Sequence, residues 1–119
     1  MARASYDLED RLIAFAADVC RICDRLPHTV TGRHVGGQLV RSGTAPLAHY
    51  GEAQGAESRR DFVHKMRVAL KELRETKAWL KFVTRVPLGE VSSARSALAE
   101  CDQLVAIFVS SVRTASKTG

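Results

Sequence analysis

Hydrophobic residues recur along most of the chain at alternating intervals of four and three positions. This spacing brings side chains onto one face of an α-helix. The clearest run predicts a helix over residues 58–84, and its members are Phe62, Met66, Ala69, Leu73, Thr76, Leu80 and Val83. The same rhythm predicts helices over residues 7–26 and 90–113.

Residues 31–53 carry a weaker pattern. Several glycines lie in this segment, and each weakens a helix by roughly 1 kcal/mol relative to alanine. Pro46 also removes one backbone donor and presses against the carbonyl four residues earlier. We therefore expect a helix that is kinked or locally opened near Pro46. Four helices joined by short links predict an all-α fold, an antiparallel up-down four-helix bundle that forms a single domain over residues 1–119.

The composition limits the class of protein. The chain has 119 residues, of which 45% are hydrophobic and 26% are charged. These fractions are ordinary for a globular domain and argue against a disordered chain. The longest apolar run, residues 104–109, is far shorter than the roughly 20 residues that a membrane-spanning helix needs. The N-terminal residues lack the apolar core of a signal peptide, and the three cysteines are an odd number, so we expect reduced thiols and a cytoplasmic protein.

The positive charge is concentrated in one predicted helix. Between Glu57 and Arg85 there are nine basic and four acidic residues, so this segment alone accounts for the net charge of +5. Six of the bases share one flank of the helix, offset from the hydrophobic stripe, and we call them the basic flank: Arg60, Arg67, Lys71, Arg74, Lys81 and Arg85. We predict that the basic flank binds nucleic acid, because such a row neutralises successive phosphates. In the alternative interpretation it faces water or another subunit, with local pairs such as Asp61–Lys65 and Lys71–Glu75.

Two of the predicted helices are more hydrophobic than a bundle core requires. Residues 104–109 are apolar on every side for more than one turn, and Trp79 and Phe82 lie beside the core stripe of their helix. A bundle helix needs only one buried face, so the surplus indicates burial against a second surface. We predict subunit contacts at Trp79, Phe82, Leu104 and Ile107.

The chain has few residues in the patterns that catalysis or metal binding requires. Cys20 and Cys23 form a C-x-x-C pair near which Cys101 is expected. Zinc would require a fourth ligand and a redox motif would require βαβ surroundings, so core packing is the favoured interpretation. None of the four histidines has the paired spacing of a metal site: His28, His34, His49 and His64. With no nucleophile elbow and no phosphate-binding glycine loop, we predict no enzymatic activity, no metal and no cofactor.

The middle of the chain carries recognisable motifs. They are Gln38-Leu39, Arg41-Ser42-Gly43-Thr44, Ala48 and Glu52-Ala53, followed by Asp61-Phe62, Lys65-Met66, Ala69-Leu70-Lys71-Glu72, Glu75-Thr76 and Trp79-Leu80. With these motifs the chain resembles the bacterial four-helix-bundle proteins associated with intervening sequences in 23S ribosomal RNA genes, over about residues 6–113. It departs from the family pattern at Pro46-Leu47, where the family has a small or β-branched residue and then glycine. His49 stands where the family has asparagine.

The resemblance implies an antiparallel four-helix bundle, assembled as a homopentamer, with no established enzymatic activity. Distant relatives include the accessory proteins of diversity-generating retroelements, which are basic pentamers that associate with nucleic acid and a reverse transcriptase. The implied partners are therefore further copies of the chain, RNA or DNA, and a reverse transcriptase or another protein.

Two functions fit the residues and the resemblance. The first is a non-enzymatic, oligomeric accessory protein that binds RNA or DNA electrostatically through the basic flank. The alternative is an oligomeric scaffold that holds another protein, in which the positive charge is incidental. No membrane partner is expected from either.

Overall fold

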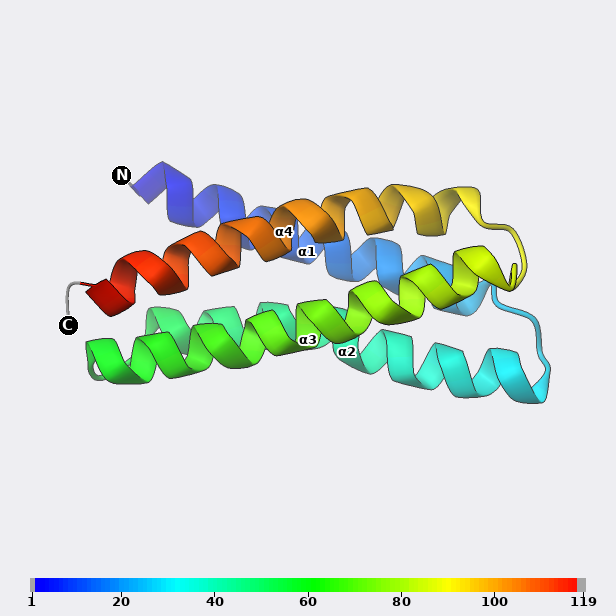
Figure 1. Cartoon of the computed structure of the whole chain (residues 1–119), viewed down its shortest axis with the longest axis horizontal. Helices are drawn as coiled ribbons and strands as arrows, with labels where there is room; N and C mark the ends of the chain where they lie inside the picture. Colours follow the sequence, from blue (N-terminus) through cyan, green and yellow to red (C-terminus); the bar gives the residue numbers. More distant parts are fainter. Residues whose placement is uncertain (1, 118–119) are drawn as a thin grey trace.

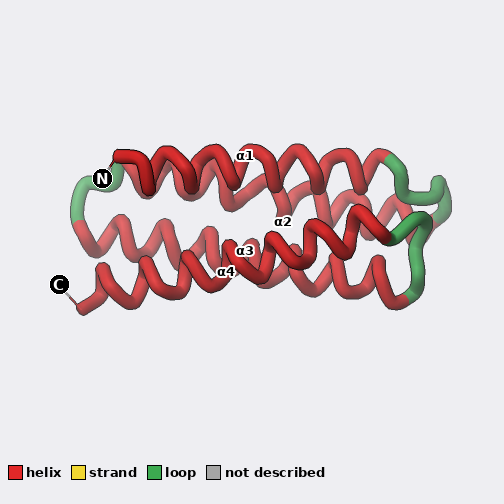
Figure 2. The backbone as a smooth tube through the Cα atoms, turned by 90° about the horizontal axis from the view of Figure 1, so that it is seen from above, coloured by secondary structure: helices red, strands yellow, loops and turns green. Residues whose placement is uncertain are grey.

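The computed structural model describes the backbone of residues 2–117 and the side chains from Asp7 onward. It contains four helices: α1 (Ala2–Asp24), α2 (Val30–Gln54), α3 (Arg59–Arg85) and α4 (Ser92–Lys117). Within residues 2–117 no strand is present. Consecutive helices run in opposite directions along one long axis, and short loops join them at the two ends of the molecule (Figures 1 and 2). The predicted all-α fold with four helices is confirmed.

The helix bounds depart from the predicted ones mainly at the two chain ends. α1 begins at Ala2, earlier than residue 7, and α4 continues to Lys117, beyond residue 113. The inner boundaries follow from local capping. The Thr29 hydroxyl accepts a hydrogen bond from the Gly32 amide at 3.0 Å, and the Ser58 hydroxyl accepts one from the Asp61 amide at 3.0 Å. These side chains satisfy amides that have no partner inside the helix, so α2 and α3 begin directly after them.

The hydrophobic stripes of all four helices meet in one core. The largest side chains with under 2% of their surface exposed are Phe15, Phe108, Leu12, Leu39, Met66, Leu73, Leu80 and Leu104. Burying a side chain of this size stabilises a fold by about 1.5–3 kcal/mol. Each helix packs most extensively against two neighbours. The diagonal helices α2 and α4 meet in the core, where the rings of Tyr50 and Phe108 pack edge to face with centroids 6.2 Å apart. The α1–α4 seam is packed least extensively of the four.

Helix α2 is continuous through Pro46, which is buried. The alternative of two separate helices is therefore excluded, and the kink at Pro46 stays a prediction. Three residues earlier, α2 approaches α1 closely: a Cβ atom on Gly43 would lie 2.6 Å from Cγ1 of Val19. Real side chains do not tolerate that distance, so glycine at this position sets how tightly α1 and α2 pack.

None of the helices within residues 2–117 combines the length and the apolar character needed to cross a membrane.

Candidate nucleic-acid interface

The basic flank lies on the outer side of α3, away from the buried stripe. Arg60, Arg67, Lys71, Arg74 and Arg85 are exposed, and Lys81 is half-buried. Because an α-helix rises 1.5 Å per residue, the row from Arg60 to Arg85 extends over about 38 Å. The molecule is 47 Å long, so the row follows most of its length. Its amphipathic spacing therefore produces the straight line of cations that the sequence predicted.

Among the described residues, the cations of the basic flank form no salt bridge, unlike Lys65 and Lys77 on the same helix. Within the described part of the chain no carboxylate lies at ion-pair distance from any of the six. The bases on neighbouring positions are paired: Lys65 with Glu52 at 3.2 Å and Lys77 with Asp102 at 2.8 Å. The local pairs of the alternative interpretation do not form, since Lys65 bonds Glu52 rather than Asp61 and the Glu75 carboxylate bonds Arg41 rather than Lys71.

Helix α4 extends the basic flank into a furrow. A hollow of about 410 Å³ lies between α3 and α4, bordered by Arg67 and Arg74 on one side and by Arg113 and Lys117 on the other. A second hollow of about 390 Å³ adjoins it at Arg67. We call the two hollows together the basic furrow, and its cationic residues are Arg59, Arg60, Arg67, Arg74, Arg113 and Lys117.

The electrostatics of the basic furrow are of one sign. Its two hollows contain no Asp or Glu among their lining residues within the described chain. Its floor is apolar and includes Leu70, Val109 and Val112. Walls of low dielectric and a single sign of charge focus the field into the furrow and attract anions.

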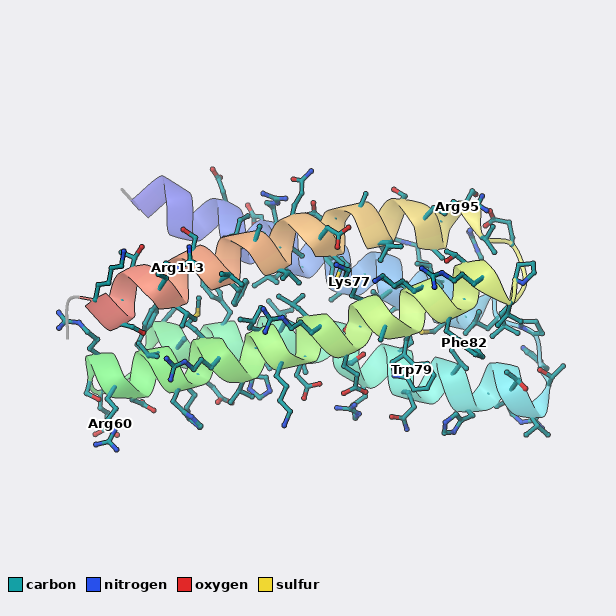
Figure 3. All side chains as sticks on the ribbon, in the orientation of Figure 1. Arg60, Lys77, Trp79, Phe82, Arg95 and Arg113 are labelled. Carbon is teal, nitrogen blue, oxygen red and sulfur yellow. The ribbon has the colours of Figure 1, made fainter. Side chains whose placement is uncertain are left out.

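Sequence reasoning missed the contribution of α4. Arg113 and Lys117 are four residues apart, on one side of a helix that was predicted to end at residue 113. Because α4 runs antiparallel to α3, its last turns lie beside the first turns of α3, and Figure 3 shows Arg113 and Arg60 at the same end of the molecule. The sequence feature that could have revealed this contribution is the four-residue spacing of Arg113 and Lys117, which continues the helical pattern beyond residue 113.

The motif residues behind the resemblance contact one another across the α2–α3 seam. Arg41 bonds the carboxylates of both Glu72 and Glu75, the first at 3.2 Å. The hydrogen bond from Arg41 holds the pKa of Glu75 below its ordinary value. Behind this pair, Thr76 Oγ1 lies 2.9 Å from Ser42 Oγ in a fully buried contact. We call these residues the motif joint: Arg41, Ser42, Glu72, Glu75 and Thr76. The next motif residue, Gly43, faces Val19 of α1 instead.

A match to a protein-family model decides which family this chain belongs to. The family model for the 23S rRNA-intervening sequence protein matches residues 6–110, which include the whole motif joint. The chain belongs to this family. No curated protein matches it.

A solved structure supports the assignment of this chain to the 23S rRNA-intervening sequence protein family. It is a protein with unknown function from the S23 ribosomal protein family of Bacteroides thetaiotaomicron VPI-5482, 27% identical to this chain. The match covers 92% of this chain and 97% of the solved one, with a TM-score of 0.83. Neither description names a reaction.

The predicted subunit contacts do not lie together in this family member. Leu104 is completely buried in the bundle core, so its prediction as a subunit contact is wrong: the apolar run turns Leu104 and Phe108 inward. Ile107 is half-buried beside a hollow that Leu8 of α1 also lines. Trp79 and Phe82 point to a different side, toward α2 (Figure 3).

Trp79 and Phe82 form an aromatic strip at one end of the α2–α3 face. The two rings pack edge to face with centroids 6.1 Å apart, and Trp79 meets His34 of α2 in the same way at 6.0 Å. Trp79 is half-buried and its indole nitrogen donates to Glu75 at 3.3 Å. Phe82 is 40% exposed and Val86, one turn further, is 49% exposed. This apolar surface remains available for a partner.

Two of the three cysteines are packing residues by their surroundings, since Cys101 lies in the core and Cys23 packs against it. Cys101 is buried and its thiol donates to the Leu73 carbonyl at 3.3 Å. Burial raises the pKa of Cys101 and of half-buried Cys23 to about 12, so both thiols are protonated and unreactive at neutral pH. His49 faces Glu52 at 4.0 Å without a third ligand. In the described chain no group of three or more His, Cys, Asp or Glu side chains is arranged to hold a metal.

Proposed function

We propose that this protein is a non-enzymatic accessory protein that binds RNA or DNA through the basic flank and the basic furrow. The observation that carries this proposal is a contrast within α3: Lys65 and Lys77 have carboxylate partners, while the six cations of the flank have none at ion-pair distance among the described residues. A row of uncompensated cations of this length is expensive to keep on an ordinary surface and is typical of a polyanion-binding face. The furrow adds Arg113 and Lys117 to that face.

Binding through these side chains is electrostatic. Each Lys or Arg that neutralises a phosphate releases condensed counterions, so affinity falls steeply with salt, by a slope of about 0.7–0.9 per contact in log affinity against log salt. The cations reach phosphates rather than base edges, since they line a shallow furrow between two helices. Sequence preference is therefore small, and the protein recognises the charge and shape of its ligand.

The test compares a furrow variant with a matched control. In Arg67→Gln/Lys71→Gln/Arg74→Gln, three cations of the basic flank are removed, and the salt slope for a labelled oligonucleotide between about 50 and 200 mM salt falls by about 2–3. The control Arg21→Gln/Arg25→Gln/Arg33→Gln removes three exposed bases outside the furrow, one in α1, one in the loop that follows it and one in α2. It leaves the salt slope unchanged. Circular dichroism checks that both remain helical. The proposal is overturned if the salt slope falls equally in both variants, or if the parent protein does not bind the oligonucleotide at about 50 mM salt.

We propose further that the protein self-associates through the aromatic strip. Phe82, Val86 and Val30, which is 79% exposed, place apolar surface at one end of α2 and α3. Covering this surface with a second copy would repeat the basic furrow around an assembly and raise its avidity for one long polyanion. Light scattering tests this: Phe82→Ser/Val86→Ser lowers the assembly mass, whereas Ile13→Ser, which changes a 47% exposed residue on α1, leaves it unchanged. A monomeric parent contradicts self-association.

The aromatic strip also supports the second candidate, a scaffold that holds another protein. That function requires no nucleic acid. It is favoured if the parent protein has no salt-dependent affinity for any oligonucleotide while Phe82→Ser/Val86→Ser abolishes capture of a defined protein partner.

A further inference from the structure

The basic furrow contains no flat hydrophobic ring. Among its described lining residues there is no Phe, Tyr or Trp, and the imidazole of His64 is its single ring. The large aromatic side chains lie elsewhere: Phe15 and Phe108 are completely buried, and Trp79 and Phe82 lie on the α2 side of α3 (Figure 3). The cationic surface and the aromatic surface of this protein are thus separate.

This separation bears on the kind of nucleic acid that the furrow accepts. Proteins that hold single strands combine a basic groove with aromatic side chains, and each stacked base contributes about 1–3 kcal/mol. A duplex keeps its bases stacked on one another and presents a regular double row of phosphates. It is recognised by backbone contacts and shape, for which cations alone are sufficient.

The geometry of the cations agrees with a regular, stiff ligand. Arg60, Arg67, Arg74 and Lys81 repeat every seven residues, which is about 10.5 Å along a helix, so the row is about 31 Å long. One turn of a duplex is roughly 34–36 Å. Arg113 and Lys117 form a second, shorter row on α4, whose axis lies about 8–10 Å away as for any packed helix pair. Two rigid rows fit a rod-like polyanion without the entropy cost of straightening a flexible strand.

We propose that the ligand of the basic furrow is double-stranded nucleic acid, contacted along its phosphate backbone over about one helical turn. This inference rests on the proposed function and specifies its substrate class. Duplexes also carry the denser charge, so each contact contributes a slope of about 0.9 on a duplex against about 0.7 on a single strand. Six furrow cations would then give a slope of about 5 on a duplex.

The experiment compares probes of equal phosphate number. A duplex of about 21 base pairs, made once as RNA and once as DNA, is measured by fluorescence anisotropy against unstructured uridine and thymidine homopolymers of about 42 nucleotides. We expect the duplexes to bind at least about fivefold more tightly, with the steeper salt slope. Arg60→Gln/Arg67→Gln/Arg74→Gln removes this preference, and the matched control Arg21→Gln/Arg25→Gln/Arg33→Gln retains it.

The length of a duplex stem and the imidazole ring of His64 provide two further tests. Shortening a hairpin stem from about 12 to about 6 base pairs, less than the length of the cationic row, lowers affinity at least about fivefold. His64→Ala leaves the ratio of duplex to single-strand affinity unchanged, because on this proposal the bases of the ligand stay stacked on one another and do not use the imidazole ring.

The possible failures are distinguishable. Single strands that bind as tightly as duplexes, or a His64→Ala variant that loses single-strand binding, overturn the duplex inference and leave electrostatic binding intact. Absence of binding to every probe overturns both proposals. A preference between the RNA and the DNA duplex supports the inference and identifies A-form or B-form geometry as the feature recognised.

Discussion

The two sides of α3 follow opposite electrostatic rules. On the side of α2, the charged and polar groups of the motif joint are paired, with Arg41 between Glu72 and Glu75 and Thr76 against Ser42. On the side of α4, the cations of the basic furrow line a surface without an acidic residue in the described chain. The difference teaches that the residues which identify the family hold the bundle together. The cations that line the basic furrow lie outside the motifs.

The largest expected effect on the motif-joint side comes from Gly43. Gly43→Ala places a methyl group against Val19, a stiff β-branched side chain, and lowers the free energy of unfolding by about 2–3 kcal/mol through overpacking. Gly37→Ala is the matched control, because no atom lies within 4 Å of its new methyl group. It raises stability by up to about 1 kcal/mol, as alanine does in an open helix position. Urea unfolding measures both, and equal effects would show that α1 and α2 are not in tight contact here.

The buried hydroxyl pair gives the next largest effect. Thr76→Val leaves Ser42 Oγ without the partner at 2.9 Å, which costs about 1–2 kcal/mol of unfolding free energy. Thr76→Ser retains the hydroxyl and most of the stability. The double variant Ser42→Ala/Thr76→Val recovers part of the loss, since both polar groups are then removed. Additive losses in a double-mutant cycle would contradict direct coupling.

The stability effect of the ion pair between Arg41 and Glu75 is smaller and depends on pH. Arg41 holds the pKa of Glu75 below its ordinary 4.5, so the pair stabilises the fold above the unfolded pKa and is lost as pH falls through the folded one. Both side chains are partly exposed and screened by solvent, so Arg41→Gln lowers the free energy of unfolding less at neutral pH than Thr76→Val does. The cost shrinks as pH falls below the ordinary pKa of Glu75 and through its lowered value in the folded state. A cost that persists in acid would assign the effect of Arg41 to packing.

The smallest expected effect is on the furrow side. Arg67→Gln/Arg74→Gln/Arg113→Gln changes the unfolding free energy by no more than about 0.5 kcal/mol per site, because these side chains are exposed and form no salt bridge within the described residues. A change toward higher stability at low salt reflects relief of like-charge repulsion. Destabilisation comparable with that of Thr76→Val would remove the distinction between the two sides of α3.

The sequence predicted the four helices and their core faces well because both follow from local periodicity. Met66, Leu73 and Leu80 are each 1% exposed or less, as the spacing requires. Leu104 was wrongly placed because a run that is apolar on every side does not indicate which face turns inward. Only the packing of α4 against its neighbours determines that.

The candidate site was predicted in part. The basic flank of α3 was found because it is periodic within one helix. Arg113 and Lys117 were missed because their role depends on the antiparallel register of two helices. The pairing of Arg41 with Glu72 and Glu75 depends in the same way on how α2 and α3 are aligned, and no local pattern contains that information.

The loosely packed seam between α1 and α4 sets the order in which the molecule opens. Across this seam the Arg11 guanidinium donates to both oxygens of Glu100, at 3.0 and 2.8 Å, and to the Gln103 side chain at 3.0 Å. α2 and α3 share the motif joint and the more extensive contact. Local opening therefore starts with α1, whose amides exchange with solvent sooner than those of α2 and α3. The helix that leaves first is not part of the basic furrow, so the cationic face on α3 and α4 outlasts the first step of unfolding.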